Sequence, residues 1–121
     1  GKIVKKIKIS RDDYISVTTV YGVERISLGE ILYVEAEAHR ITYHLTERKI
    51  TYSGTLSACE KILPAEYFIR CYQSFIINLK YVASCNGTEI TMTDGTVIPL
   101  SRARRKEVMA KLAAYFHKGK F

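Results

Sequence analysis

Four cations stand close together near the end of the sequence, in the segment Ser101-Arg102-Ala103-Arg104-Arg105-Lys106. The apolar residues after it recur at intervals of three and four, which predicts an amphipathic helix with Ser101 as its N-cap. Cations oppose the partial positive charge at the start of a helix, at a cost of roughly 0.3–1 kcal/mol each. A bound phosphate would remove this conflict, because arginine forks and free helix amides both bind phosphate oxygens. We therefore predict nucleic-acid contacts from Ser101, Arg102, Arg104, Arg105 and Lys106, with a solvated basic surface as the alternative.

A second polar segment, from Glu35 to Arg40, separates two predicted strands and is expected to form an exposed connection. From there His39 and Arg40 could reach into a nucleic-acid groove. Glu35 and Glu37 would repel phosphates unless they face elsewhere. On spacing alone, an ordinary exposed surface is the simpler interpretation of this segment.

Polar residues also interrupt the hydrophobic pattern between Arg70 and Asn78. Gln73 carries the amide that can pair with adenine N6 and N7, and Ser74 can hold a phosphate. The alternative is that Ser74 and Asn78 satisfy backbone groups in a turn, which is the interpretation we favour for Asn78.

The composition fits one basic domain. The chain has 121 residues, of which 47% are hydrophobic, and a formal net charge of +7. Residues 1–60 hold nine basic and eight acidic side chains, whereas residues 61–121 hold ten and four. Such an uneven basic surface attracts a polyanion, either nucleic acid or an anionic membrane, although solubility explains the net charge equally well. We interpret residues 1–6 as a linker remnant and residues 7–121 as the domain; Gly1 in place of Met suggests a fragment of a longer protein.

Several functional classes find no support in the sequence. The three cysteines and three histidines lack ligand-like spacing, so we expect neither a metal site nor a disulfide framework, and a reducing, cytoplasmic compartment. No catalytic motif is found, so we expect no enzyme and no cofactor. Cys71, next to Arg70, could be a redox-sensitive thiol, but its apolar neighbours favour a buried structural cysteine. No apolar run approaches the ~20 residues of a membrane span, so no membrane contact is expected.

The elements that would position these residues are mostly short strands. Alternating apolar residues predict strands at Ile7-Ile9, Ile15-Val17, Ile26-Leu28 and Ile31-Tyr33, then a hairpin of residues 40–45 and 49–52. A short helix is predicted from Leu56 to Pro64, with Thr55 or Ser57 as its N-cap.

More strands are predicted for residues 67–71 and 75–77, from Tyr81 onward, and for residues 89–92 and 97–100. Asp94-Gly95 forms the turn between the last two. The closing helix would bury Val108, Met109, Leu112, Tyr115 and Phe116. The expected fold is mainly β, with compact antiparallel sheets, a short internal helix and a C-terminal amphipathic helix.

The order of these segments carries a family resemblance. Ile31-Leu32-Tyr33-Val34-Glu35-Ala36, the run from Phe68 to Leu79, and Ile98-Pro99-Leu100-Ser101-Arg102 before the closing helix resemble the LytTR family of bacterial DNA-binding domains. The likeness extends from about Ile26 to Phe116. It implies a β fold whose connecting loops, and not a recognition helix, enter successive major grooves on one face of bent DNA. It further implies direct-repeat sites and an attached receiver or sensor domain, and it allows for a dimer on DNA.

The matching motifs imply roles for single residues. His39 matches the polar base-reading position of the first loop, and Gln73 matches that of the second. Arg102, Arg104 and Arg105 fall in the last contact loop. The position of the base-reading arginine falls on Ala103, which leaves open which neighbouring arginine reads a base.

The sequence therefore predicts sequence-specific binding of double-stranded DNA by the output domain of a bacterial two-component response regulator. The expected contacts come from His39-Arg40, Gln73-Ser74 and the segment from Ser101 to Lys106. The alternative is a single-stranded nucleic-acid binding module that uses Tyr43, Tyr52 or Tyr72 as stacking platforms.

Overall fold

The computed structural model describes residues 13–118, and within them the fold is mostly β. The strands are β1 (Tyr14–Thr19), β2 (Gly22–Ser27), β3 (Ile31–Glu37), β4 (Arg40–Leu45), β5 (Lys49–Ser53), β6 (Phe68–Tyr72), β7 (Phe75–Asn78), β8 (Val82–Cys85), β9 (Glu89–Met92) and β10 (Val97–Pro99). The helices are α1 (Leu56–Ile62) and α2 (Arg105–Lys118). Three short 3-10 turns, η1 (Leu28–Glu30), η2 (Leu79–Tyr81) and η3 (Arg102–Arg104), precede β3, β8 and α2.

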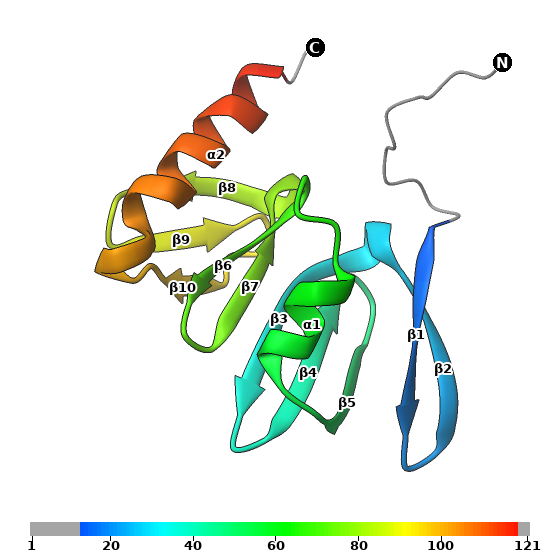
Figure 1. Ribbon diagram of the computed structural model, residues 1–121. Helices are drawn as coiled ribbons and strands as arrows, with labels where there is room; N and C mark the ends of the chain where they lie inside the picture. The colour runs from blue at the N-terminus through cyan, green and yellow to red at the C-terminus, as the bar shows by residue number, and fades with distance from the viewer. Residues whose placement is uncertain (1–12, 119–121) are drawn as a thin grey trace, which may run out of the picture.

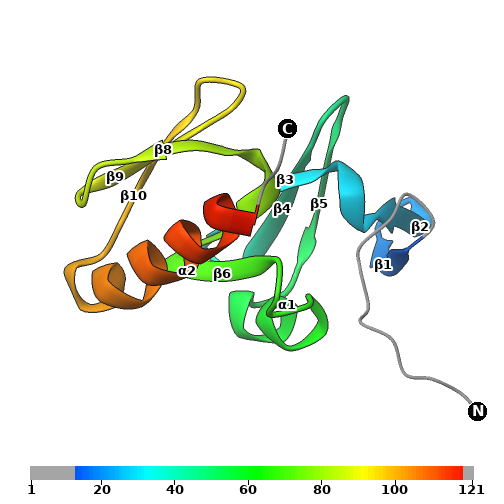
Figure 2. The same ribbon diagram turned by 90° about the horizontal axis from the view of Figure 1, so that it is seen from above.

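The strands form three antiparallel sheets (Figure 1). The central sheet has the order β5-β4-β3-β7-β6, so β3 and β7 are interior strands. A second sheet, β10-β9-β8, lies beside it together with α2, and the β1–β2 hairpin lies at the other end (Figures 1 and 2). The mainly β fold predicted from the sequence is confirmed.

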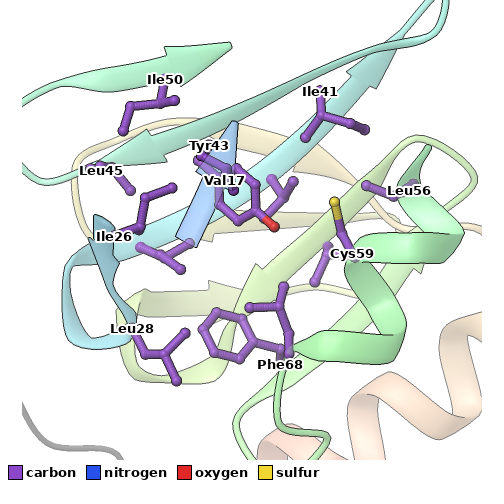
Figure 3. Packing of buried hydrophobic residues seen from close by; sticks show 14 residues of the cluster. Val17, Ile26, Leu28, Ile41, Tyr43, Leu45, Ile50, Leu56, Cys59 and Phe68 are labelled. Atoms are coloured by element: carbon purple, nitrogen blue, oxygen red, sulfur yellow. The ribbon is translucent and has the colours of Figure 1, made fainter. Parts of the chain in front are cut away.

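Strands β3, β6 and β7 of the central sheet carry buried residues on both faces, since neighbouring residues on a strand point to opposite sides. On one face Val34 and Ile76 pack with α1 and the β1–β2 hairpin. Figure 3 shows Leu56 and Cys59 of α1 directed toward Tyr43 of β4 in this cluster. On the other face Tyr33 and Ile77 pack with residues of β8, β9, β10 and α2.

Most of the predicted elements are present. The hairpin of β4 and β5 closes through residues 46–48, as predicted. Thr55 is the N-cap of α1, since its Oγ1 accepts a hydrogen bond from the Ala58 amide at 3.2 Å. Leu28 and Tyr81 lie in 3-10 turns and Leu100 lies after β10, so the strands predicted there are shorter than expected. The strand predicted at Ile7-Ile9 and the linker at residues 1–6 lie outside the described residues.

The C-terminal helix differs from its prediction in two ways. Its first turn is the 3-10 turn η3, and α2 proper begins at Arg105. Val108 and Leu112 are buried and Tyr115 is half-buried, but Met109 is 39% and Phe116 47% exposed. Only one narrow stripe of the helix contacts the sheet, so the predicted apolar face was too wide.

Candidate nucleic-acid interface

Two of the three predicted contact segments are turns at one edge of the central sheet. The first, Ala38-His39, joins β3 to β4, and the second, Gln73-Ser74, joins β6 to β7. Because β3 pairs antiparallel with both β4 and β7, the end of β3 and the start of β7 lie at the same edge. Figure 1 shows both turns there.

Backbone hydrogen bonds join the three segments. The Ala36 amide donates to the Ser74 carbonyl at 3.0 Å, which links the end of β3 to the second turn. The Ser101 amide donates to the Cys71 carbonyl at 2.9 Å, two residues before Gln73. The third segment therefore begins beside the second turn, and the fold brings together all three segments predicted from the sequence.

The first turn has an unusual backbone. Ala38 has φ of 48° and His39 has φ of 67°, both in the left-handed region that a type I′ hairpin turn requires at its two central positions. Both residues are exposed. Gly54 fixes the turn from the side, because its amide donates to the His39 carbonyl at 2.9 Å. The exposed connection predicted here is shorter than expected, since Glu35 to Glu37 still belong to β3 and Arg40 already belongs to β4.

In and after the second turn, the structure distinguishes Ser74 from Asn78, for which the sequence offered the same two roles. Gln73 is exposed and Ser74 is half-buried at the tip. Asn78, at the far end of β7, is 1% exposed and donates from Nδ2 to the Ile31 carbonyl at 2.9 Å. Its Oδ1 accepts from the Lys80 amide at 2.9 Å. The structural role favoured for Asn78 is confirmed.

The third segment is held by its cap. The Ser101 Oγ accepts a hydrogen bond from the Arg104 amide at 3.1 Å, which closes η3. Arg102, Arg105 and Lys106 are exposed, and Arg104 is half-buried. The N-cap predicted at Ser101 is confirmed, although it caps a 3-10 turn that leads into α2.

The arginines divide into two groups within residues 13–118. Arg25 lies 4.7 Å over the Tyr14 ring, and Arg48 and Arg70 form ion pairs with glutamates. The four others take part in none of the ion pairs, side-chain hydrogen bonds or ring contacts found in this part of the chain, and all four belong to the predicted contact segments: Arg40, Arg102, Arg104 and Arg105. The arginines that remain available to an anion are therefore those at this edge.

A polar groove of about 410 Å³ lies beside the first turn. Arg40 lines it together with Glu35, Glu37, Ala38, Thr42, His44 and Lys49. The Glu35 Oε1 lies 2.8 Å from His44 Nε2, and the His44 ring stacks on Tyr33 with centroids 4.2 Å apart. Sequence reasoning missed Thr42, His44 and Lys49, although the polar residues two apart on β4 indicated one polar sheet face.

Cys71 is a structural cysteine in this fold. It is fully buried, and burial is the main cause that raises the pKa of its thiol to about 12. Its Sγ lies 3.7 Å from the Pro99 carbonyl oxygen, between the central sheet and β10. The thiolate is the reactive form of cysteine, so this environment disfavours the redox-sensor alternative.

Among residues 13–118, no group of three or more His, Cys, Asp or Glu side chains could hold a metal ion. No helix in this range is long and apolar enough to cross a membrane.

Comparisons with known proteins agree with this geometry. The model of the LytTR family, described as a LytTr DNA-binding domain, matches residues 21–113. Sensory transduction protein LytT of Bacillus subtilis is 34% identical over 88 residues, which cover 69% of this chain and 36% of the relative. The LytT protein of Enterococcus faecalis is 30% identical over 101 residues, covering 77% of this chain and 42% of the relative. The chain thus spans less than half the length of these relatives.

A solved structure has the same fold. A LytTr DNA-binding domain from Bacillus cereus aligns with a TM-score of 0.68 and 24% sequence identity, covering 83% of this chain and 95% of that one. The family model matches most of the chain, a range that includes all three predicted contact segments. The chain therefore belongs to the LytTR family, a family of DNA-binding domains and not of enzymes.

Proposed function

We propose that this domain recognises specific sequences in double-stranded DNA and is the output domain of a bacterial transcription regulator. One observation carries the proposal: three segments that are distant in sequence lie at one edge, and the described arginines without an ion pair or ring contact gather there. Unpaired cations beside the first turn and at the start of α2, with the polar second turn next to them, suit the phosphates and base edges of a duplex.

The proposed recognition uses the turns as probes. The major groove is about 12 Å wide and admits a two-stranded ribbon, so the tips at His39 and Gln73 are narrow enough to enter it. Gln73 would read adenine, and an arginine of the third segment would read guanine O6 and N7. Ser74, Ser101 and Lys106 would hold phosphates, with Arg40 beside them. The segments would enter successive major grooves.

The wider protein is also a proposal. We place a receiver or sensor domain in the remaining length of the full protein, as in a two-component response regulator acting in the cytoplasm. Direct repeats in the DNA would be bound by two copies of the domain, with a dimer as one arrangement. No cofactor is needed, because recognition rests on side chains alone.

Selection of bound duplexes from a random pool tests the central claim. The expected result is an enriched motif, which a direct-repeat arrangement would show twice in the same orientation. Binding measured by fluorescence anisotropy should weaken with salt, with a slope of log K against log salt of roughly −0.9 per phosphate neutralised. No enriched motif and no duplex binding at low salt would reject the proposal.

Single arginine variants separate the two kinds of contact. An alanine variant of an arginine that reads a base should lose about 1–3 kcal/mol of DNA-binding free energy, and its sequence specificity should relax at one base position. A variant of a phosphate-binding arginine should weaken every sequence alike and reduce the salt slope by about 1. Uniform weakening by Arg102→Ala, Arg104→Ala and Arg105→Ala would reject base reading by the third segment.

Two of the three tyrosines named for the single-stranded alternative are poorly placed to stack on bases. Tyr43 is fully buried, and Tyr52 packs against α1 with its hydroxyl 3.5 Å from Cys59 Sγ. Tyr72 is 37% exposed beside Phe75 and is the one of the three that could stack on a base. Competition between a single strand and the selected duplex decides between the two functions.

A further inference from the structure

Arg70 links the second contact turn to helix α1. Its side chain is 16% exposed and lies on the α1 face of β6. The Arg70 Nη2 donates to the Gln73 carbonyl at 2.6 Å, within the turn itself. The Arg70 Nη1 donates to Glu60 Oε1 at 3.1 Å and to Ser57 Oγ at 3.4 Å, both on α1. One guanidinium thus fastens the turn to a helix.

This turn needs support from outside its own backbone. Two-residue hairpins favour the primed turn types, which require positive φ at the first or at both central residues. The Ala38-His39 turn meets that requirement, but neither Gln73 nor Ser74 has a positive φ. A β-bulge at Cys71 also shifts the register of β6 against β7 just before the turn. Bulges of this kind re-aim side chains, so the direction of this turn is set by more than strand pairing.

The chemistry of the contact suits an arginine. The planar guanidinium offers several donors in a fixed fork, so it can bond a carbonyl on one side and a carboxylate on the other. Lysine has one flexible ammonium and cannot hold both directions in the same geometry. Because both terminal nitrogens are occupied by protein oxygens, Arg70 is not presented to a phosphate as the four unpaired arginines are.

We propose that Arg70 is a positioning residue that fixes where Gln73 reads a base, with Glu60 as the residue that fixes Arg70. The inference rests on the proposed function, in which Gln73 contacts DNA. Arg70 acts through the Gln73 backbone, so its loss affects discrimination more than general attraction to DNA. Glu60 contributes by holding the fork, although its carboxylate is itself repelled by phosphates.

Variants that keep the fold test the proposal with DNA. Arg70→Lys retains the charge and loses the fork, and Glu60→Gln retains the shape and loses the charge. Loss of one charge-assisted hydrogen bond should lower discrimination about tenfold at the base position that Gln73→Ala also affects. Affinity for random duplex should stay within about twofold in Arg70→Lys, because the net charge is unchanged. Glu47→Gln, in the β4–β5 turn at the opposite edge, is the charge-matched control.

A double variant excludes a merely structural role. In the Gln73→Ala background, Arg70→Lys should add little further loss, because the side chain that it positions is already gone. Equal loss at every base position, or full additivity of the two substitutions, would overturn the proposal.

A measurement without DNA separates this proposal from the proposed function. The Ala36 amide is bonded to the Ser74 carbonyl, so its hydrogen exchange reports how firmly the turn is held. Arg70→Lys and Glu60→Gln should speed exchange at Ala36 about tenfold, while the Thr46 amide, bonded to Glu30 at the opposite edge, should not change. Unchanged exchange at Ala36 in both variants would overturn the proposal that Arg70 holds the second turn. If exchange at Ala36 speeds up in the variants but the wild-type domain selects no duplex, Arg70 does hold the turn and the proposed function fails.

Discussion

At the scale of single residues, the first contact turn stores backbone strain. Ala38 has φ of 48°, and an L-residue with a Cβ pays roughly 1–2 kcal/mol in the left-handed region. His39 also has a positive φ, but histidine is among the residues enriched there. Such strain is found where a side chain must be aimed, and here it presents His39 at an exposed tip.

Replacing the strained alanine should therefore stabilise the domain. Asparagine is preferred at the first central position of a type I′ turn, so Ala38→Asn should raise the free energy of unfolding by about 0.5–1 kcal/mol. Urea denaturation measures the change. Ala83→Asn, at an exposed position of β8 where φ is not positive, is the matched control and should be neutral or slightly destabilising. An Ala38→Asn protein no more stable than wild type would contradict the strain argument.

At the scale of elements, local pattern was enough for most of the fold. The β4–β5 hairpin, α1 with its Thr55 cap and the Asp94-Gly95 turn follow from period, capping and turn chemistry within a few residues. What sequence reasoning missed depends on tertiary contacts. Met109 and Phe116 fit the helical period, yet the buried face of α2 is the narrow stripe of Val108 and Leu112, with Tyr115 half-buried beside them.

The candidate site also combines features that the local sequence predicts with features that depend on tertiary contacts. Its residue types could be selected from the sequence, but their assembly at one edge depends on β3 pairing with β7, forty residues away. The Arg70 contact with Gln73 could not be foreseen either, because the sequence offered Arg70 only as the neighbour of Cys71. Polar spacing finds candidates, and strand order decides which of them meet.

The cap of the third segment gives a prediction at this scale. Ser101→Ala removes the side-chain acceptor of the Arg104 amide and leaves it only the Ser101 carbonyl, so it should cost about 1 kcal/mol of stability. It should also weaken duplex binding, because η3 fixes the backbone that carries Arg102 and Arg104. Ser101→Thr keeps a capping hydroxyl and should restore both properties. Lower thermal stability with unchanged duplex affinity would show that the arginines do not depend on this cap.

At the scale of the whole molecule, the predicted contact turns lie at the ends of its most buried strands. Strands β3 and β7 are interior in the central sheet, and hydrophobic clusters cover these two strands on both faces. The Ala38-His39 and Gln73-Ser74 turns therefore extend directly from strands that are packed on both sides. This arrangement favours a preformed binding surface, which loses less conformational entropy on binding DNA than a flexible loop would.

The same two-sided burial makes the whole molecule sensitive to alkali. Burial raises the pKa of Cys71 from 9.0 to about 12, and it also raises the pKa of Tyr43, Tyr52 and Tyr33 above that of free tyrosine. Above pH 9 the unfolded Cys71 thiol loses its proton while the folded one retains it. Stability from this group is thus complete below pH 9 and declines toward pH 12, by at most about 1.4 kcal/mol per pH unit.

Urea denaturation at pH 8, 9 and 10 measures this decline. Cys71→Ala should be less stable than wild type at pH 8, because a buried side chain is shortened, but its stability should fall less steeply up to pH 10. Val82→Ala, which shortens a buried side chain that has no ionisable group, is the control and should keep the wild-type slope. The buried tyrosines remain in every variant, so the difference in slope isolates the Cys71 thiol. Equal slopes for wild type and Cys71→Ala would mean that this thiol ionises as readily in the folded protein as in the unfolded chain, and burial would then not keep it unreactive.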